Sequence, residues 1–358
     1  MKGVLSLQNA IVLISYAGTA AVIAFFLSHI GEGWGGIDGQ RFHAMAGTIL
    51  AGLIPYVDFV DPKPPLLYFT IALMDYLVPG SAADAVVMAA LNVGSALLLW
   101  RIGVEDYGRV AGYSAGLLYL VGAALVQGYF LFSEQFAVFL ILCAYTLARQ
   151  SRFAGAGLAL GLACGFKQYA VLGAIPLLLL MRAEGDRRYH RFVLPVAIAA
   201  LSPFGVLYLA YGAETVFDAL FWTCGVAPAY LCGSDISGIP NYCSESPIGF
   251  VVNLVASIAM VLPTILFAGA SVARRGLRTP SEKALCLFAL LFVLTILIRQ
   301  YLHYWIMALP FLALLACREF ADDRPVRQDP DGISKGTSVE RCSPLPDPHK
   351  EEGQGERE

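Results

Sequence analysis

The sequence has 358 residues, of which 58% are hydrophobic and 14% are charged, and its formal net charge is -3. A soluble domain usually carries about 25% charged residues, so this composition argues against one. Apolar runs of about 20 residues recur along the chain and predict an all-α, polytopic integral membrane protein, whereas a transmembrane β-barrel needs short alternating segments. No basic stripe with interleaved aromatic residues is present, which excludes a nucleic-acid partner.

The first apolar segment covers residues 9–30 and is long enough to cross a membrane. No small-residue cleavage pattern of the signal-peptide kind follows it, so we expect a retained first helix. Apolar residues at helical spacing over 39–53 then predict a short amphipathic helix that lies in the membrane interface. This helix belongs to a first outer loop that we place at residues 31–84.

The segment 64–78 decides the topology, because it is apolar but short and contains Asp75. If it crossed the membrane, the loops rich in arginine would all face outward, against the positive-inside rule. We therefore predict a second interfacial segment here and both termini in the cytoplasm. The remaining predicted spans are residues 85–103, 110–128, 136–148, 153–167, 169–181, 192–212, 248–270, 284–299 and 304–317.

These segments predict one membrane domain over residues 1–320, with about ten spans. Residues 213–247 form a large outer loop that is able to serve as a lid. The polar tail 321–358 is predicted to be disordered and cytoplasmic. Three cysteines, Cys224, Cys232 and Cys243, share the large outer loop, and the sequence leaves open whether two of them form a disulfide.

The predicted topology gathers polar side chains from separate parts of the chain at one membrane face. Ionisable groups within a membrane protein are costly, so such a gathering indicates a functional site. The candidates are Asp38, His43, Asp58, Asp61, Lys63, Glu134, Lys167, Gln168, Arg299, His303 and Tyr304.

Each candidate also has an ordinary structural explanation. Asp38 is placed to cap the amphipathic helix. Lys167 interrupts about 30 apolar residues, and it would either extend to lipid headgroups or bind an anionic group. Arg299, His303 and Tyr304 would either form an interfacial belt of aromatic and basic side chains or clamp a phosphate. The convergence of the candidates on one face favours the functional explanation.

The stretch from Pro55 to Tyr68, with Asp58, Asp61 and the run Lys63-Pro64-Pro65, resembles the GT-C superfamily of glycosyltransferases. The resemblance is closest to the bacterial dolichyl-phosphate-mannose-protein mannosyltransferase and aminoarabinose (lipid A) transferase group. Asp38 in the first outer loop, Glu134 at a later outer turn, Lys167-Gln168 after a glycine-rich helix and His303-Tyr304 near the last spans extend it over roughly residues 10–317.

The resemblance implies catalytic roles for Asp38 and Glu134 and places Lys63 in the same outward cavity. Many members of the group have Asp-Glu where this chain has Asp38-Gly39, so one carboxylate on which a metal site would depend is missing. A divalent cation held by Asp38 and Glu134 stays an open alternative. The sequence also lacks the large outer C-terminal domain of some members, which would leave acceptor recognition to residues 213–247.

The residues themselves suit transfer of a sugar from a polyprenyl phosphate. A cation is needed to stabilise the departing phosphate, and Lys63, Lys167 or Arg299 would supply it. A carboxylate is needed to take the proton of the acceptor hydroxyl, and Asp38 is our choice. We therefore predict an inverting membrane glycosyltransferase at the periplasmic face of the bacterial inner membrane, acting on a glycan, lipid or protein acceptor.

Two other functions fit the same features. A transporter or flippase of lipid-linked saccharides also uses charged residues within the membrane, but transporters commonly show internal repeats, and none is evident here. A non-catalytic assembly subunit would tolerate the loss of Asp38 and Lys63 together. Transport and sugar transfer predict different positions for the charged residues. A transport path would run between both membrane faces, whereas the residues of a transferase site would gather at one face.

Overall fold

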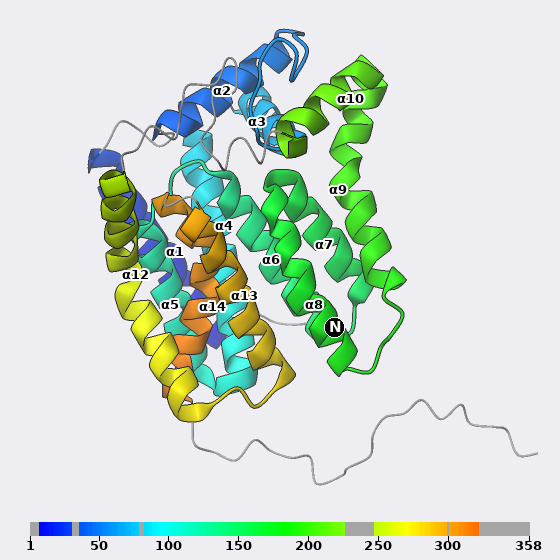
Figure 1. The fold of residues 1–358 in the computed structure, drawn as a ribbon. Coiled ribbons are helices and arrows are strands. Elements are labelled where there is room, and N and C mark those ends of the chain that lie inside the picture. Colours follow the sequence, from blue (N-terminus) through cyan, green and yellow to red (C-terminus); the bar gives the residue numbers. More distant parts are fainter. Residues whose placement is uncertain (1–6, 31–35, 79–81, 226–246, 299–300, 322–358) are drawn as a thin grey trace, which may run out of the picture. The chain divides into compact units, whose positions relative to one another are not determined.

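Helices dominate the described part of the chain (Figure 1). The computed structural model describes residues 7–30, 36–78, 82–225, 247–298 and 301–321. Among these residues there is no β-strand, and the only pairing of that kind is an isolated bridge between Pro55 and Phe59. The predicted all-α class is therefore confirmed.

The described residues of the first half of the chain form eight helices and one 3₁₀ turn. They are α1 (Leu7–Ile30), α2 (Gly36–Leu50), α3 (Pro65–Leu77), α4 (Ala82–Tyr107), α5 (Arg109–Leu125), α6 (Ser133–Arg149), α7 (Phe153–Phe166), the 3₁₀ turn η1 (Gln168–Gly173) and α8 (Ala174–Ala183).

The described residues of the second half form five more helices and three short helical turns. They are α9 (His190–Tyr211), α10 (Ala213–Leu220), the π-helical turn η2 (Phe221–Gly225), α12 (Pro247–Arg275), α13 (Pro280–Ile298), the 3₁₀ turn η3 (Leu302–Tyr304), α14 (Trp305–Cys317) and the 3₁₀ turn η4 (Arg318–Phe320).

A helix occupies each segment that the sequence predicted to span or to lie in the interface. By length and composition, α1, α4, α9, α12 and α13 are able to cross a membrane. The apolar helices α3, α5, α7 and the η1–α8 pair are shorter. The short α10 and the turn η2 lie inside the predicted large outer loop, where the sequence reading expected no helix.

The main core surrounds α14, whose sequence WIMALPFLALLAC is apolar throughout and whose side chains are all buried. It packs against α5, α12 and α13. Small residues bring other helices close together. A methyl group on Gly161 of α7 would lie 2.4 Å from the carbonyl oxygen of Val196 in α9, so only glycine permits this separation. The helices α7 and α9 therefore pack with their backbones in contact.

A second core lies at one end of the bundle, where α2, α3 and α10 gather (Figure 1). It joins Phe42 of α2 and Leu67 of α3 to Leu207 of α9 and Ala219 of α10. Tyr56 is buried in the same core and comes from the loop between α2 and α3. Elements that are far apart in the sequence thus share one apolar core at this end.

Ion pairs lie at the C-terminal ends of α6 and α14. Arg149 closes α6 and pairs with Asp106 at the end of α4. Arg318 follows α14 and lies 3.0 Å from Glu282 at the start of α13, and it also donates a hydrogen bond to the carbonyl of Gly276. The interior of α14 separates these pairs from the polar residues at its other end.

Candidate functional site

The centre of the site is an ion pair between Glu134 and Lys167. Glu134 is the second residue of α6, and Lys167 directly follows the last residue of α7. A short turn joins the two helices at their other ends, so the start of α6 meets the end of α7. The Lys167 ammonium lies 2.5 Å from Oε1 of Glu134. Glu134 is 1% exposed and Lys167 is 4% exposed, so the pair is buried.

Aromatic rings and hydroxyl groups enclose this pair. The Lys167 ammonium lies 4.7 Å from the ring centre of Tyr304 and 5.0 Å from that of Tyr169, both within the range of cation–π attraction. The hydroxyl of Tyr169 donates to Oε1 of Glu134 at 3.2 Å, and the hydroxyl of Ser133 donates to Oε2 at 3.0 Å. Both charges of the pair are thus compensated within the protein.

His303 completes the group from the turn before α14. Its Nε2 lies 3.8 Å from Oε1 of Glu134. Its ring stacks on Phe132, with centroids 4.1 Å apart, and it is also stacked with Tyr301. The imidazole is therefore held between two aromatic rings, with one edge toward the carboxylate.

The charges set the protonation states. Burial by itself raises the pKa of Glu134, but the Lys167 ammonium, with His303 and Lys63, lowers that pKa to about 2. Burial lowers the pKa of His303 to about 4, with Lys167 and Lys63 acting in the same direction and Glu134 and Asp38 opposing them. Near neutral pH, Glu134 is ionised and His303 is neutral.

The same influences place Asp38 and Lys63 near this group. Asp38 lies in the first turn of α2 and carries a charge close enough to raise the pKa of His303. Lys63 lowers the pKa of both Glu134 and His303. Five of the predicted residues therefore form one electrostatic cluster, which we call the charged cluster: Asp38, Lys63, Glu134, Lys167 and His303.

Asp61 holds the loop that carries Lys63. Its Oδ1 accepts a 2.5 Å hydrogen bond from the Tyr68 hydroxyl, and its Oδ2 lies 3.6 Å from the guanidinium of Arg41. The Lys63 ammonium lies 3.6 Å from Oδ1 of Asp61 and 4.7 Å from the ring centre of Phe42. Asp61 is 1% exposed and thus serves as the buried anchor of the loop.

Other predicted residues lie elsewhere. His43 bridges two carboxylates, with Nδ1 2.9 Å from Asp75 and Nε2 2.7 Å from Asp84, and so ties α2 to α3 and α4. Asp58 is exposed, and it accepts a hydrogen bond from the backbone of Ile54 across a turn. Both contacts are structural, and the predicted binding roles of the two residues stay predictions.

Four further predictions have different outcomes. Arg299 lies outside the described residues, and so do Cys232 and Cys243. Cys224 is a free, exposed thiol. Tyr304 is buried beside Lys167, as described above, and the side chain of Gln168 contacts two backbone carbonyls rather than the charged cluster.

The structure adds three side chains that sequence reasoning did not select. Tyr169 donates to Glu134, Tyr68 donates to Asp61, and Arg41 pairs with Asp61. Tyr169 directly follows Lys167-Gln168, and Tyr68 ends the stretch that carries the family resemblance, so their positions held a signal. Arg41 gave none, because an arginine on an amphipathic helix is ordinary.

A divalent cation does not fit the described residues. No group of three His, Cys, Asp or Glu side chains able to hold a metal occurs in the described ranges. Glu134, one of the two predicted ligands, is already bound to Lys167. A cation at this carboxylate would have to displace the buried ammonium.

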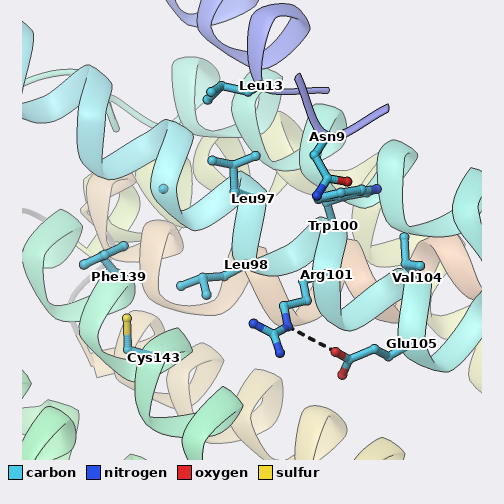
Figure 2. Close-up of a pocket in the computed structure, with 11 residues that line it drawn as sticks. Asn9, Leu13, Leu97, Leu98, Trp100, Arg101, Val104, Glu105, Phe139 and Cys143 are labelled. Carbon is cyan, nitrogen blue, oxygen red and sulfur yellow. Dashed lines mark hydrogen bonds and ion pairs between the residues drawn. The ribbon is translucent and has the colours of Figure 1, made fainter. Parts of the chain in front are cut away.

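A cavity of about 630 Å³ lies apart from the charged cluster, between α1, α4 and α6 (Figure 2). Its walls are largely apolar, with Leu97, Leu98 and Phe139 among them. The ion pair at its margin joins Arg101 to Glu105 on the same helix, at 3.1 Å. No member of the charged cluster lines it, so its size gives no reason to place the reaction there.

Comparison with known proteins relates this chain to others through its fold. No protein-family model matches the sequence, and no curated protein matches it. The crystal structure of ArnT from Cupriavidus metallidurans bound to undecaprenyl phosphate has a TM-score of 0.60 and 14% sequence identity, over 85% of this chain and 59% of that chain. The same ArnT in the apo state gives a TM-score of 0.60 with 16% identity, over 85% and 58%.

The chain thus spans less than two thirds of the length of the ArnT chains it matches. The likeness covers the fold of most of this chain. The resemblance to GT-C glycosyltransferases that the sequence indicated is confirmed at the level of fold.

Proposed function

We propose that this protein is a membrane glycosyltransferase that moves a sugar from a polyprenyl-phosphate donor to an acceptor glycan, lipid or protein at the periplasmic face. The observation that carries the proposal is the charged cluster. It assembles two carboxylates, two ammonium groups and an imidazole from four separate parts of the chain. The fold is shared with ArnT, which was crystallised with undecaprenyl phosphate, and this supports a lipid phosphate as the donor's carrier.

The proposed arrangement in the membrane has about ten spans, with α2 and α3 in the outer interface. The short helix α3 is kept out of the spans because, if it crossed the membrane, the arginine-rich loops would face outward, against the positive-inside rule. The basic loop after α8 would then face the cytoplasm, and the charged cluster would face the periplasm.

Asp38 is the proposed general base. In a single displacement, the acceptor oxygen forms a bond to the anomeric carbon while the bond from that carbon to the phosphate oxygen breaks. The acceptor proton passes to the Asp38 carboxylate, and the polyprenyl phosphate leaves with the electrons of the broken bond. Such a step inverts the anomeric configuration. Glu134 is less suited to this role, because its low pKa makes it a weak base.

Lys63 is the proposed partner of the departing phosphate. Lys167 is enclosed by Glu134 and two tyrosine rings, so its charge is already compensated. Lys63 stands on the loop between α2 and α3, its side chain is 17% exposed, and its ammonium lies 3.6 Å from Asp61, farther than Lys167 lies from Glu134. A cation near the developing phosphate charge lowers the barrier because the charge increases in the transition state. Arg299 stays a second candidate for this role.

Transport of the lipid-linked sugar is less consistent with the structure. A path between the two membrane faces would need polar groups along the interior. The charged cluster lies at one end of α6 and α14, and the ion pairs of Arg149 and Arg318 lie at the other. Between them α14 is apolar and fully buried.

The test is transfer from defined polyprenyl-phosphate sugars carrying a labelled sugar, with the purified protein in lipid nanodiscs. Asp38→Asn should lower the transfer rate by at least about 100-fold, the scale of general base catalysis. Asp186→Asn, in the loop between α8 and α9, should retain the wild-type rate. Wild-type rates with Asp38→Asn would remove this residue from the role. In a separate assay the protein is placed in lipid vesicles. If it moves intact lipid-linked sugar across the vesicle membrane and transfers none, the protein is a transporter and the proposed function is wrong.

A further inference from the structure

Gln168 joins two segments that are distant in the sequence. Its Nε2 donates to the carbonyl of Pro62 at 2.9 Å and to the carbonyl of Thr223 at 3.1 Å. Pro62 belongs to the loop that carries Lys63, and Thr223 belongs to η2, which follows α10. Gln168 itself directly follows Lys167 of the charged cluster.

These contacts fix the orientation of the amide. Both acceptors are carbonyl oxygens, so only the NH₂ group can face them, and its two hydrogens are both used. Oε1 is left buried with no hydrogen-bond partner among the described residues. The donors of Gln168 are therefore committed to the backbone and are not available to a sugar or a phosphate.

On one side, the contact fixes the position of Lys63. Pro62 stands between Asp61, which is anchored by Tyr68, and Lys63, whose carbonyl accepts a 2.6 Å hydrogen bond from the Tyr56 hydroxyl. The hydrogen bond from Gln168 to the Pro62 carbonyl is the third contact that holds this loop, beside those of Tyr68 and Tyr56. The orientation of the Lys63 side chain depends on the backbone that these contacts hold.

On the other side, the contact holds the end of a short helical segment. Residues 213–225 comprise α10 and η2, and Phe217 and Phe221 of this segment are exposed. Thr223 is 2% exposed, and Trp222 packs on the second core, which also contains Tyr56. The tip of the segment is thus seated against the Lys63 loop.

We propose that Gln168 is a positioning residue that fastens residues 213–225 to the Lys63 loop, so that Lys63 is held in place for the leaving phosphate only when this segment is seated. The role of Lys63 in this statement rests on the proposed function. The fastening itself is a property of the structure. One amide thereby links the lid-like segment to the cation of the site.

The first experiment measures the fastening without any transfer assay. Thr223→Cys places a thiol at a buried position in a chain whose native cysteines are replaced by Ala, and its rate of reaction with a water-soluble maleimide is followed. Gln168→Glu keeps the side-chain size but removes both donors and faces the carbonyls with a carboxylate. We expect the reaction to become at least about tenfold faster, which corresponds to about 1.4 kcal/mol.

Two further variants control this measurement. Gln150→Glu, an exposed position at the other end of α6, should leave the labelling rate unchanged. Gln168→Met also lacks donors but adds no charge, and it should accelerate labelling as well. It keeps the test decisive if Gln168→Glu does not fold. Equal labelling rates with and without the Gln168 substitution would overturn the proposal.

The second experiment measures the link to Lys63. Gln168→Met should lower kcat for transfer by about tenfold in the wild-type background and have little further effect in a Lys63→Ala background, because residues acting through one another are not additive. Fully additive losses would overturn the link. A wild-type protein with no transferase activity would defeat the proposed function, whereas the labelling result would still decide whether Gln168 fastens the segment.

Discussion

Glu134 and Asp38 are both carboxylates of the site, yet their surroundings differ. Glu134 is buried against an ammonium and two hydroxyl groups, and its pKa lies far below its usual range because of Lys167. Asp38 stands at the start of α2 and is partly exposed. A strongly paired carboxylate organises its neighbours, whereas a less committed one is able to accept a proton. This contrast favours Asp38 as the base and Glu134 as the group that holds Lys167.

Removing the negative charge of the buried pair should be costly. Glu134→Gln leaves the Lys167 ammonium buried without its counter-charge, so we expect a loss of about 3–5 kcal/mol in the free energy of unfolding. The measurement is thermal unfolding in detergent. Glu105→Gln is the matched control, because Glu105 is half exposed and its pairs with Arg101 and Arg149 should each contribute less than about 1 kcal/mol. Adding Lys167→Met to Glu134→Gln should restore most of the loss. Equal effects of the two single variants would contradict this assignment.

The lowered pKa of His303 predicts a pH dependence of stability. Unfolded histidine titrates near 6.5, and His303 in the folded protein titrates at about 4. Between these values the unfolded state binds the proton and the folded state does not, so the free energy of unfolding should fall as the pH decreases from 6.5 to 4. The full effect is of the order of 3 kcal/mol, since one pKa unit corresponds to about 1.4 kcal/mol.

The comparison variant for this dependence is His303→Phe, which keeps an aromatic ring on Phe132 but does not titrate. The difference in unfolding free energy between the wild type and this variant, measured across that pH range, isolates His303 from the other histidines. A difference that stays constant with pH would show that His303 is not buried in its neutral form.

Single charged residues were largely predictable from the sequence, and their partners were not. Glu134, Lys167 and His303 stood out because each interrupts or borders an apolar run. Tyr169 was not selected although it directly follows Lys167-Gln168, since a tyrosine in an apolar context usually reports packing or an interface. His43 looked like a site residue for the same reason as the others, and the structure places it between Asp75 and Asp84.

At the scale of the helices, close packing depends on glycines that face a neighbouring backbone. A methyl group on Gly112 of α5 would lie 2.5 Å from the carbonyl oxygen of Trp100 and 2.7 Å from the nitrogen of Val104, both in α4. Backbone atoms of a helix cannot move aside as a side chain can. The separation of α4 and α5 is therefore set at this point.

Gly112→Ala should destabilise the protein by about 1–3 kcal/mol, the usual range for overpacking. Gly18→Ala in α1 is the control, because nothing lies within 4 Å of its added methyl group. Alanine is favoured over glycine inside a helix by up to about 1 kcal/mol, so the control should be neutral or slightly stabilising. The two midpoints of thermal unfolding in detergent give the comparison, and a stable Gly112→Ala protein would refute the packing argument.

The membrane spans that the sequence predicted are apolar and easily recognised. The helix that it missed, α10, is short and contains charged residues. The eight residues of α10 mix Glu214 and Asp218 with apolar residues between two turns, which gives too few residues for a reliable period. Its position is decided by contacts with the preceding helix α9 and with the second core, whose residues in α2 and α3 are far away in the sequence. Tertiary packing rather than local preference makes this helix.

For the whole molecule, the distribution of polar groups gives a testable orientation. Cys224 is exposed and lies at the end with the charged cluster, whereas Arg187 is exposed in the loop between α8 and α9. In a chain that keeps Cys224 and has its other cysteines replaced by Ser, we expect an impermeant thiol reagent added to intact spheroplasts to label Cys224. In a chain with all native cysteines replaced by Ser, Arg187→Cys should be labelled only after the membrane is opened. Labelling of both without opening would reject the predicted orientation.

The backbone contact between α7 and α9 closes a ring within the chain. Gln168 follows α7, and its hydrogen bond to the carbonyl of Thr223 links α7 to η2; the chain from η2 back through α10 leads to α9, which packs against α7. Gly212 stands between α9 and α10 with a φ of 89°, a backbone angle that glycine adopts easily. If the hydrogen bond between Gln168 and Thr223 breaks, residues 213–225 would rotate about Gly212. A chemical cross-link between α10 and α3 would then hold residues 213–225 in the seated position for crystallisation. Replacing Gln168 by a smaller residue would favour the position in which they are not seated.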